Sequence, residues 1–181
     1  MELLRAHQPA TFHSLRVRHA EYMPLGTPYP RVVARVQEIL QHPDLMSNCA
    51  VVADATGVGA PVIDMLRAAR LGCDLTAVMI TGGDKQTQSG STYNVPKRDL
   101  LASLQILLER SELKIPRSLP QLSALLRELH DFSATIGPNG RTRLGADGCG
   151  EHDDLVIALA LACWRAKRAQ NGYGNNRLPG I

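Results

Sequence analysis

Several features that would assign a protein to a class are missing from this sequence. Its four cysteines, Cys49, Cys73, Cys149 and Cys163, are widely spaced and form no Cys-x-x-Cys pair. That spacing argues against a disulfide framework or a zinc knuckle and favours reduced thiols. No apolar run approaches the ~20 residues of a membrane span, and no signal peptide or lipidation motif opens the chain. We therefore expect a cytoplasmic protein with no membrane partner.

Aromatic residues and excess charge are also scarce. Only 4% of the residues are aromatic, so base stacking cannot be a major term in any binding of nucleic acid. The net charge of +3, from 20 basic and 17 acidic residues, permits an anionic partner without requiring one. The 181 residues are 44% hydrophobic, which is enough for one buried core. We expect one domain over residues 1–168 and a flexible, polar tail over residues 169–181.

Short apolar runs predict an α/β fold with a parallel sheet. Cys49–Asp54 and Leu75–Thr81 are both suited to buried strands, and the first has the character of a central one. Pro61 is well placed in the first turn of a helix between them, and a strand–helix–strand order implies parallel pairing. Thr11–Tyr22 alternates between apolar and polar residues, so we expect one or two antiparallel strands there.

Helices and loops follow from periodicity and turn residues. Apolar residues at helical spacing predict four further helices. The polar, glycine-bearing segment Gly82–Asn94 is expected to be a mobile loop, and Pro138-Asn139-Gly140 predicts a hairpin over Ser133–Leu144. The four helices are expected at Tyr29–Gln41, Pro96–Arg110, Leu119–Phe132 and Asp153–Arg168.

Two groups of carboxylates stand out. Asp54 ends a predicted parallel strand, where open α/β sheets place their ligands, although it could equally satisfy the glycine turn that follows. His152, Asp153 and Asp154 directly precede ten apolar residues, Leu155 to Trp164. In the first turn of a buried helix, these acids would meet the positive end of the helix dipole; a capping role is the alternative.

Together these carboxylates suggest a site for hard divalent metal. Mg²⁺ prefers one or two carboxylates together with water and substrate phosphate. Two such ions about 4 Å apart would clamp the attacking and leaving oxygens of a phosphodiester displacement. Five basic residues in or beside the neighbouring loops could contact phosphates, or could be solvated loop charge. They are Lys85, Lys97, Arg98, Arg141 and Arg143.

Rival chemistries have less support. Thr56-Gly57-Val58-Gly59 hints at a dinucleotide fingerprint, but the third glycine of that pattern is absent. There is no P-loop motif, and no nucleophile elbow supports a serine triad. A zinc site built from His130, Cys149, His152 and Cys163 has no ligand spacing behind it.

An ordered set of segments resembles the nuclease domain of phage terminase large subunits. In order, these are VVADATGVGAPVIDMLR, VMITGGD, NVPKRDLLASLQILLE, LKIP and GEHDDLVIALALACW, and the resemblance runs from about Arg16 to Trp164. It implies an RNase H-like mixed sheet flanked by helices and two-metal-ion cutting of concatemeric DNA during genome packaging. Asp54 resembles the family's central-strand carboxylate, and Asp153 and Asp154 its acidic pair, with His152 in an orienting role.

The resemblance also implies a cofactor, several partners and the absence of one strand that carries an essential Asp. The cofactor would be Mg²⁺ or Mn²⁺. The partners would be double-stranded DNA and the terminase ATPase domain, small subunit and portal, in the cytoplasm of a bacterial host. The family has a first strand with another essential Asp, whereas residues 1–15 contain no Asp. We therefore expect an N-terminally truncated fold with an incomplete metal site. A catalytically inactive fragment that only binds DNA or the packaging complex is the alternative.

Overall fold

The computed structural model describes residues 14–45, 49–57, 59–134 and 153–175. Its centre is a four-stranded sheet in the order β2-β3-β5-β4. Strand β2 (Ala50–Asp54) pairs in parallel with β3 (Asp74–Thr81), and β3 in parallel with β5 (Thr92–Pro96). Strand β4 (Thr87–Ser89) is antiparallel to β5. The predicted α/β fold with a mostly parallel sheet is confirmed.

Strand β2 was predicted to be central, and this is wrong for the part of the chain that the structure describes. There it forms one edge of the four-stranded sheet. Val51, Val52 and Ala53 are nevertheless half-buried, because helix α5 (Asp154–Asn175) packs against this strand. An edge strand covered by a helix carries the same apolar run as a central one, so composition alone could not separate them.

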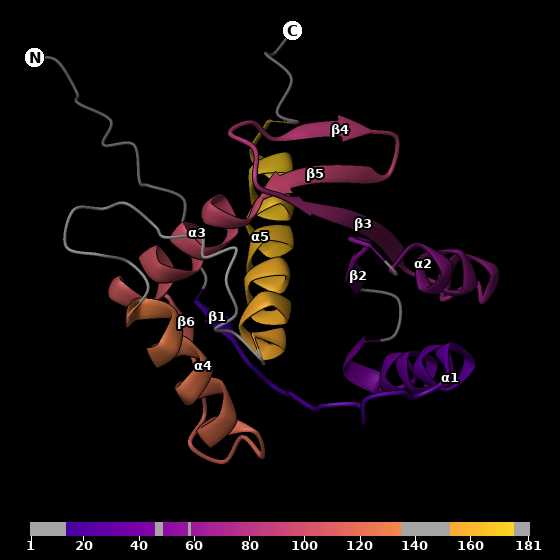
Figure 1. The fold of residues 1–181 in the computed structure, drawn as a ribbon, viewed down its shortest axis with the longest axis horizontal. Coiled ribbons are helices and arrows are strands. Elements are labelled where there is room, and N and C mark those ends of the chain that lie inside the picture. The colour runs from indigo at the N-terminus through magenta and orange to yellow at the C-terminus, as the bar shows by residue number, and fades with distance from the viewer. Residues whose placement is uncertain (1–13, 46–48, 58, 135–152, 176–181) are drawn as a thin grey trace, which may run out of the picture.

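Helices lie on both sides of the sheet (Figure 1). All the predicted helices form, but α5 continues past Arg168 to Asn175, and α4 begins at Leu122 rather than Leu119. None of the described helices combines the length and apolar character that crossing a membrane requires. The other helices are α1 (Tyr29–Leu40), the 3-10 turn η1 (Pro43–Leu45), α2 (Gly59–Ala68), α3 (Lys97–Glu109) and α4 (Leu122–Ala134).

The segment Gly82–Asn94 is not the mobile loop that its composition suggested. It contains β4 and the start of β5, joined by a turn in which Gly90 has φ +58°. Asn94 Nδ2 donates to Thr87 Oγ1 at 2.9 Å across the pair. Every residue of β4 is exposed, so this edge strand is held by backbone pairing and polar contacts, and no apolar pattern marked it.

The N-terminal strands also differ from expectation. Strand β1 (Leu15–Arg16) pairs in parallel with β6 (Leu113–Lys114), and no antiparallel pair forms among the described residues before Tyr22. Leu15 N donates to Glu112 O and Val17 N to Lys114 O. Leu15 and Val17 pack against the main core, which satisfies the apolar alternation without a hairpin. Of the predicted Ser133–Leu144 hairpin, residues 133–134 belong to α4 and the rest lies outside the described residues.

Both faces of β3 are buried, and the residues on each face show which helices cover it. Val78 and Ile80 face the larger core, which is shared with α3, α4 and α5. Ala77 and Met79 face a smaller cluster with Ile63 of α2. Successive residues of a strand point to opposite faces, so this alternation places α2 on one face and α3–α5 on the other. The sheet is therefore the middle layer of three.

Candidate functional site

Asp54 lies exposed at the carboxyl end of β2, within a tightly held turn. Its Oδ1 accepts a hydrogen bond from Thr56 N at 2.8 Å. Thr56 Oγ1 in turn accepts from Ile80 N at 2.9 Å, and Ala55 N donates to Val78 O, so the turn is tied to β3. The turn-forming role considered for Asp54 is thus present, and it fixes the direction in which this carboxylate points.

The start of α2 approaches this turn so closely that only glycine fits. A Cβ on Gly59 would lie 2.5 Å from the carbonyl oxygen of Asp54, and Gly57 has φ +60°. These are the glycines that resembled a dinucleotide fingerprint. Ile63, four residues after Gly59, is buried beside Ala55 and Ala77. Gly59 is explained by the close approach to Asp54, and Gly57 by its positive φ.

Asp153 and Asp154 lie at the start of α5, as predicted, and Asp153 has a cationic partner. Lys97, the first residue of α3, donates from Nζ to Asp153 Oδ2 at 2.5 Å. Both side chains are partly exposed, at 36% for Lys97 and 45% for Asp153. The Asp153 carbonyl accepts from Ile157 N, which makes it the first hydrogen bond of the helix. Lys97 was expected to contact phosphate, but here its ammonium neutralises a candidate metal ligand.

Glu128 is part of this site, although the sequence did not single it out. It projects from α4, is only 7% exposed, and accepts from Val156 N at 3.0 Å through Oε2. Its Oε1 accepts from the Tyr22 hydroxyl. Burial first, and then this hydrogen bond and the charge of Glu128, raise the pKa of Tyr22 to about 12. The first turn of α5 is therefore capped by an acid from another helix.

One sequence feature could have found Glu128. It lies three residues after Leu125 and one before Leu129, on the apolar stripe of α4. An acid at a core-facing position is rare unless it is paired, so it indicates a specific partner.

The remaining basic residues are only partly available for phosphate. Arg98 pairs with the Asp84 carboxylate and donates from NH2 to the Asp84 carbonyl at 3.1 Å. Lys85 is exposed just before β4. Arg141, Arg143 and His152, the other predicted site residues, lie outside the described part of the chain.

The zinc alternative gains nothing from the described residues. Cys163 is buried in the core, where burial raises the pKa of its thiol to about 11. His130 lies exposed on α4, and Cys149 and His152 are not described. In the described ranges, no group of three or more His, Cys, Asp or Glu residues is positioned to hold a metal ion.

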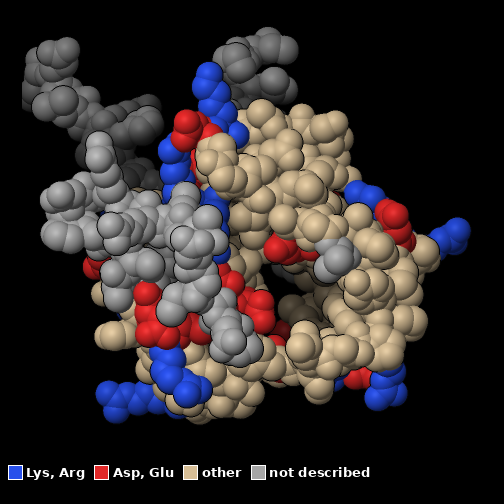
Figure 2. Space-filling view, in the orientation of Figure 1, with Lys and Arg blue, Asp and Glu red and all other residues tan. Residues whose placement is uncertain are grey.

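In Figure 2, acidic side chains lie along part of the rim of a hollow that is seen between α5 and β2 in this view. Asp54 ends β2, and Asp153 and Asp154 lie at the start of the helix that packs on that strand. Carboxylate oxygens are suitable ligands for a hard cation, which would have to compete with Lys97 for Asp153. Comparison of the chain with protein-family models, curated proteins and solved structures finds no match.

Proposed function

We propose that the chain is an RNase H-like nuclease domain, of the kind found in phage terminase large subunits, that hydrolyses DNA phosphodiesters with divalent metal. The observation that carries the proposal is the packing of α5 against β2. It joins the helix that begins with Asp154 to the strand that ends with Asp54. The acidic side chains on the rim of the hollow in Figure 2 would attract cations and repel DNA until metal binds.

Asp54, Asp153 and Asp154 would hold Mg²⁺ or Mn²⁺, and His152 would orient a ligand or a phosphate. Bound metal supplies an activated water and stabilisation of the leaving 3′ oxygen. In this scheme Lys97 has two roles. Without metal it neutralises Asp153, and a metal held by Asp153 would leave its ammonium free to contact a DNA phosphate.

Cutting of supercoiled plasmid DNA tests the proposal. We expect nicking that requires Mn²⁺ or Mg²⁺ and falls at least about 100-fold in Asp54→Asn and Asp153→Asn, because each removes a charged metal ligand. Asp44→Asn, at an exposed carboxylate in η1 beside His42, is the matched control and should cut normally. Cutting without metal, or cutting unaffected by both substitutions, would refute the proposal.

A second candidate is a catalytically inactive domain that only binds DNA or the packaging complex. It is favoured by the occupied carboxylates, since Asp54 Oδ1 holds the turn and Asp153 Oδ2 holds Lys97. This candidate predicts DNA binding that weakens linearly on a log–log plot as salt rises, and no cutting at any Mn²⁺ concentration. Fluorescence anisotropy measures the binding of a labelled DNA duplex over a salt series. Together with the plasmid assay, it distinguishes a nuclease from a domain that only binds DNA.

A further inference from the structure

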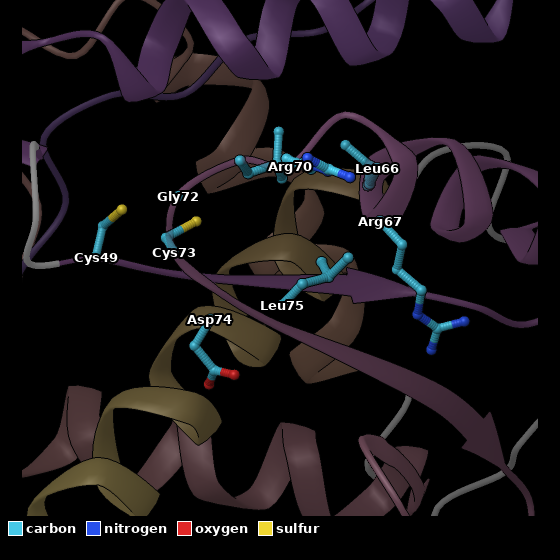
Figure 3. A pocket seen from close by; sticks show the side chains of 9 residues that line it. Cys49, Leu66, Arg67, Arg70, Gly72, Cys73, Asp74 and Leu75 are labelled. Carbon is cyan, nitrogen blue, oxygen red and sulfur yellow. The ribbon is translucent and has the colours of Figure 1, made fainter.

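Two of the cysteines directly precede neighbouring strands, at matching positions. Ala50 of β2 pairs with Asp74 of β3, so the residues just before them, Cys49 and Cys73, lie opposite each other in the same register. Both are half-buried. Figure 3 shows the two thiols rising on the same side of the strands, along one open depression of about 650 Å³. The chain therefore holds a pair of thiols at the amino end of its parallel sheet.

The separation of these residues suits a disulfide. Neighbouring strands lie about 4.8 Å apart, and the Cα atoms of a disulfide are usually about 4.4–6.8 Å apart. Neither cysteine is itself within a strand, and Gly72, with φ +72°, immediately precedes Cys73. The backbone at this point is therefore not fixed by the sheet, and small torsional changes can bring the two sulfurs into bonding geometry.

We propose that Cys49 and Cys73 form a modification site that a hydroperoxide oxidises to a disulfide. One thiolate attacks the peroxide oxygen, which forms a sulfenic acid and releases an alcohol, or water when the oxidant is hydrogen peroxide. The second thiol attacks the sulfenic sulfur and releases water. In total the dithiol loses two electrons and two protons, and the hydroperoxide is reduced. A thiol such as dithiothreitol reverses the change by exchange.

The residues around the two thiols determine how their oxidation depends on pH. Arg67 of α2, Arg70 and Asp74 line the same depression. Burial first, and then interaction with the Cys49 thiol and the charge of Asp74, raise the pKa of the Cys73 thiol. The thiolate is the reactive form, so oxidation by peroxide should be slow at neutral pH and accelerate as the pH rises.

The test is peroxide oxidation of the full-length chain followed by mass spectrometry. We expect a mass loss of about 2 Da on disulfide formation, a linked peptide pair containing Cys49 and Cys73, and full reversal by dithiothreitol. Cys49→Ser and Cys73→Ser should each abolish the linked pair. Cys163→Ser is the matched control and should still form it, since Cys163 is buried in the main core. A link from either cysteine to Cys149, or irreversible oxidation with no link, would overturn the proposal.

A second probe does not depend on the rate of oxidation. Phenylarsine oxide binds two thiols held close together, so it should bind the native protein one to one and protect both cysteines from alkylation. Either single serine variant should lose this binding, with Cys163→Ser unaffected. Equal binding by all variants would show that the two thiols do not act together. The site lies at the opposite end of β2 from Asp54, so its failure would leave the proposed nuclease untouched.

Discussion

Glu128 fixes the first turn of α5 through a contact from outside that helix. Replacing it with Ala would leave the buried Val156 N–H without its acceptor and the Tyr22 hydroxyl without its partner. An unsatisfied buried donor costs about 1–3 kcal/mol. We expect Glu128→Ala to lower the free energy of unfolding by that amount in urea titrations. Glu128→Gln can accept only one of the two bonds and should fall between Ala and wild type.

The control for Glu128 is Glu109→Ala, at an exposed residue that ends α3. Substitutions at such positions usually change stability by less than about 0.5 kcal/mol. If Glu128→Ala were no more damaging than Glu109→Ala, Glu128 would not be the cap of α5.

A substitution at Gly59, next to Asp54, should also destabilise the folded chain. Its Cβ would lie 2.5 Å from the Asp54 carbonyl oxygen, so Gly59→Ala must push the turn away from α2. We expect a loss of about 1–3 kcal/mol, as in other overpacked sites, together with weakened metal-dependent cutting. Gly83→Ala is the matched control, because its Cβ would meet only Thr81 Oγ1, at 3.7 Å. Equal stability of the two variants in thermal unfolding would contradict the close approach.

The sequence drew attention to Asp54, Asp153 and Asp154 because each group borders an apolar run, a short one before Asp54 and a long one after Asp154. It could not find their contacts. Lys97 follows a strand that is distant from Asp153 along the chain, and Glu128 lies within a helix whose leucines dominate its pattern. Such pairings depend on how α3, α4 and α5 pack, and no local pattern encodes that arrangement.

At the scale of elements, the extended segment after β1 is anchored to α1 by an ion pair. Arg35 donates from Nε and NH2 to Glu21 at 2.8 Å each, and His19 lies 2.9 Å from the same carboxylate. The Arg35 hydrogen bond first, and then that of His19, lower the pKa of Glu21 to about 2 from 4.5. A lowered folded pKa gives stability that is present above pH 4.5 and is lost as the pH falls towards 2.

We therefore expect the free energy of unfolding to fall over this acid range, and to fall less steeply in Glu21→Gln. The difference should be small and should shrink in high salt, because the pair is partly exposed. Urea titrations at several pH values measure it, with Glu109→Gln as a control for the loss of one carboxylate. An identical acid slope in wild type and Glu21→Gln would show that this ion pair does not form.

Elements with strong apolar periodicity were predictable, and elements made by pairing were not. The strands near Asp54 and Thr81 and the helices α1 and α3 were found with nearly correct limits. The β4–β5 hairpin was missed because its first strand is polar and fully exposed. The edge position of β2 was missed because burial by α5 gives it the composition of a central strand.

At the scale of the whole molecule, the proposed metal site would couple metal binding to stability through the two carboxylate groups and Lys97. Metal that binds only the folded chain raises its apparent stability, by about 2.7 kcal/mol at a concentration 100-fold above Kd. Lys97 occupies Asp153 Oδ2 and must be displaced first. We expect Lys97→Met to be destabilised by at most about 1 kcal/mol without metal, as is usual for partly exposed pairs, and to bind Mn²⁺ more tightly than wild type.

Thermal unfolding over a Mn²⁺ series measures both effects. The Lys97→Met protein should reach its stabilised plateau at a lower Mn²⁺ concentration, yet cut DNA more slowly, because the phosphate contact is lost. Lys85→Met, which removes an exposed charge before β4, should leave the Mn²⁺ response unchanged. If Mn²⁺ stabilised neither wild type nor Lys97→Met, Asp153 would be held by Lys97 for structural reasons alone, and the DNA-binding alternative would be the better account.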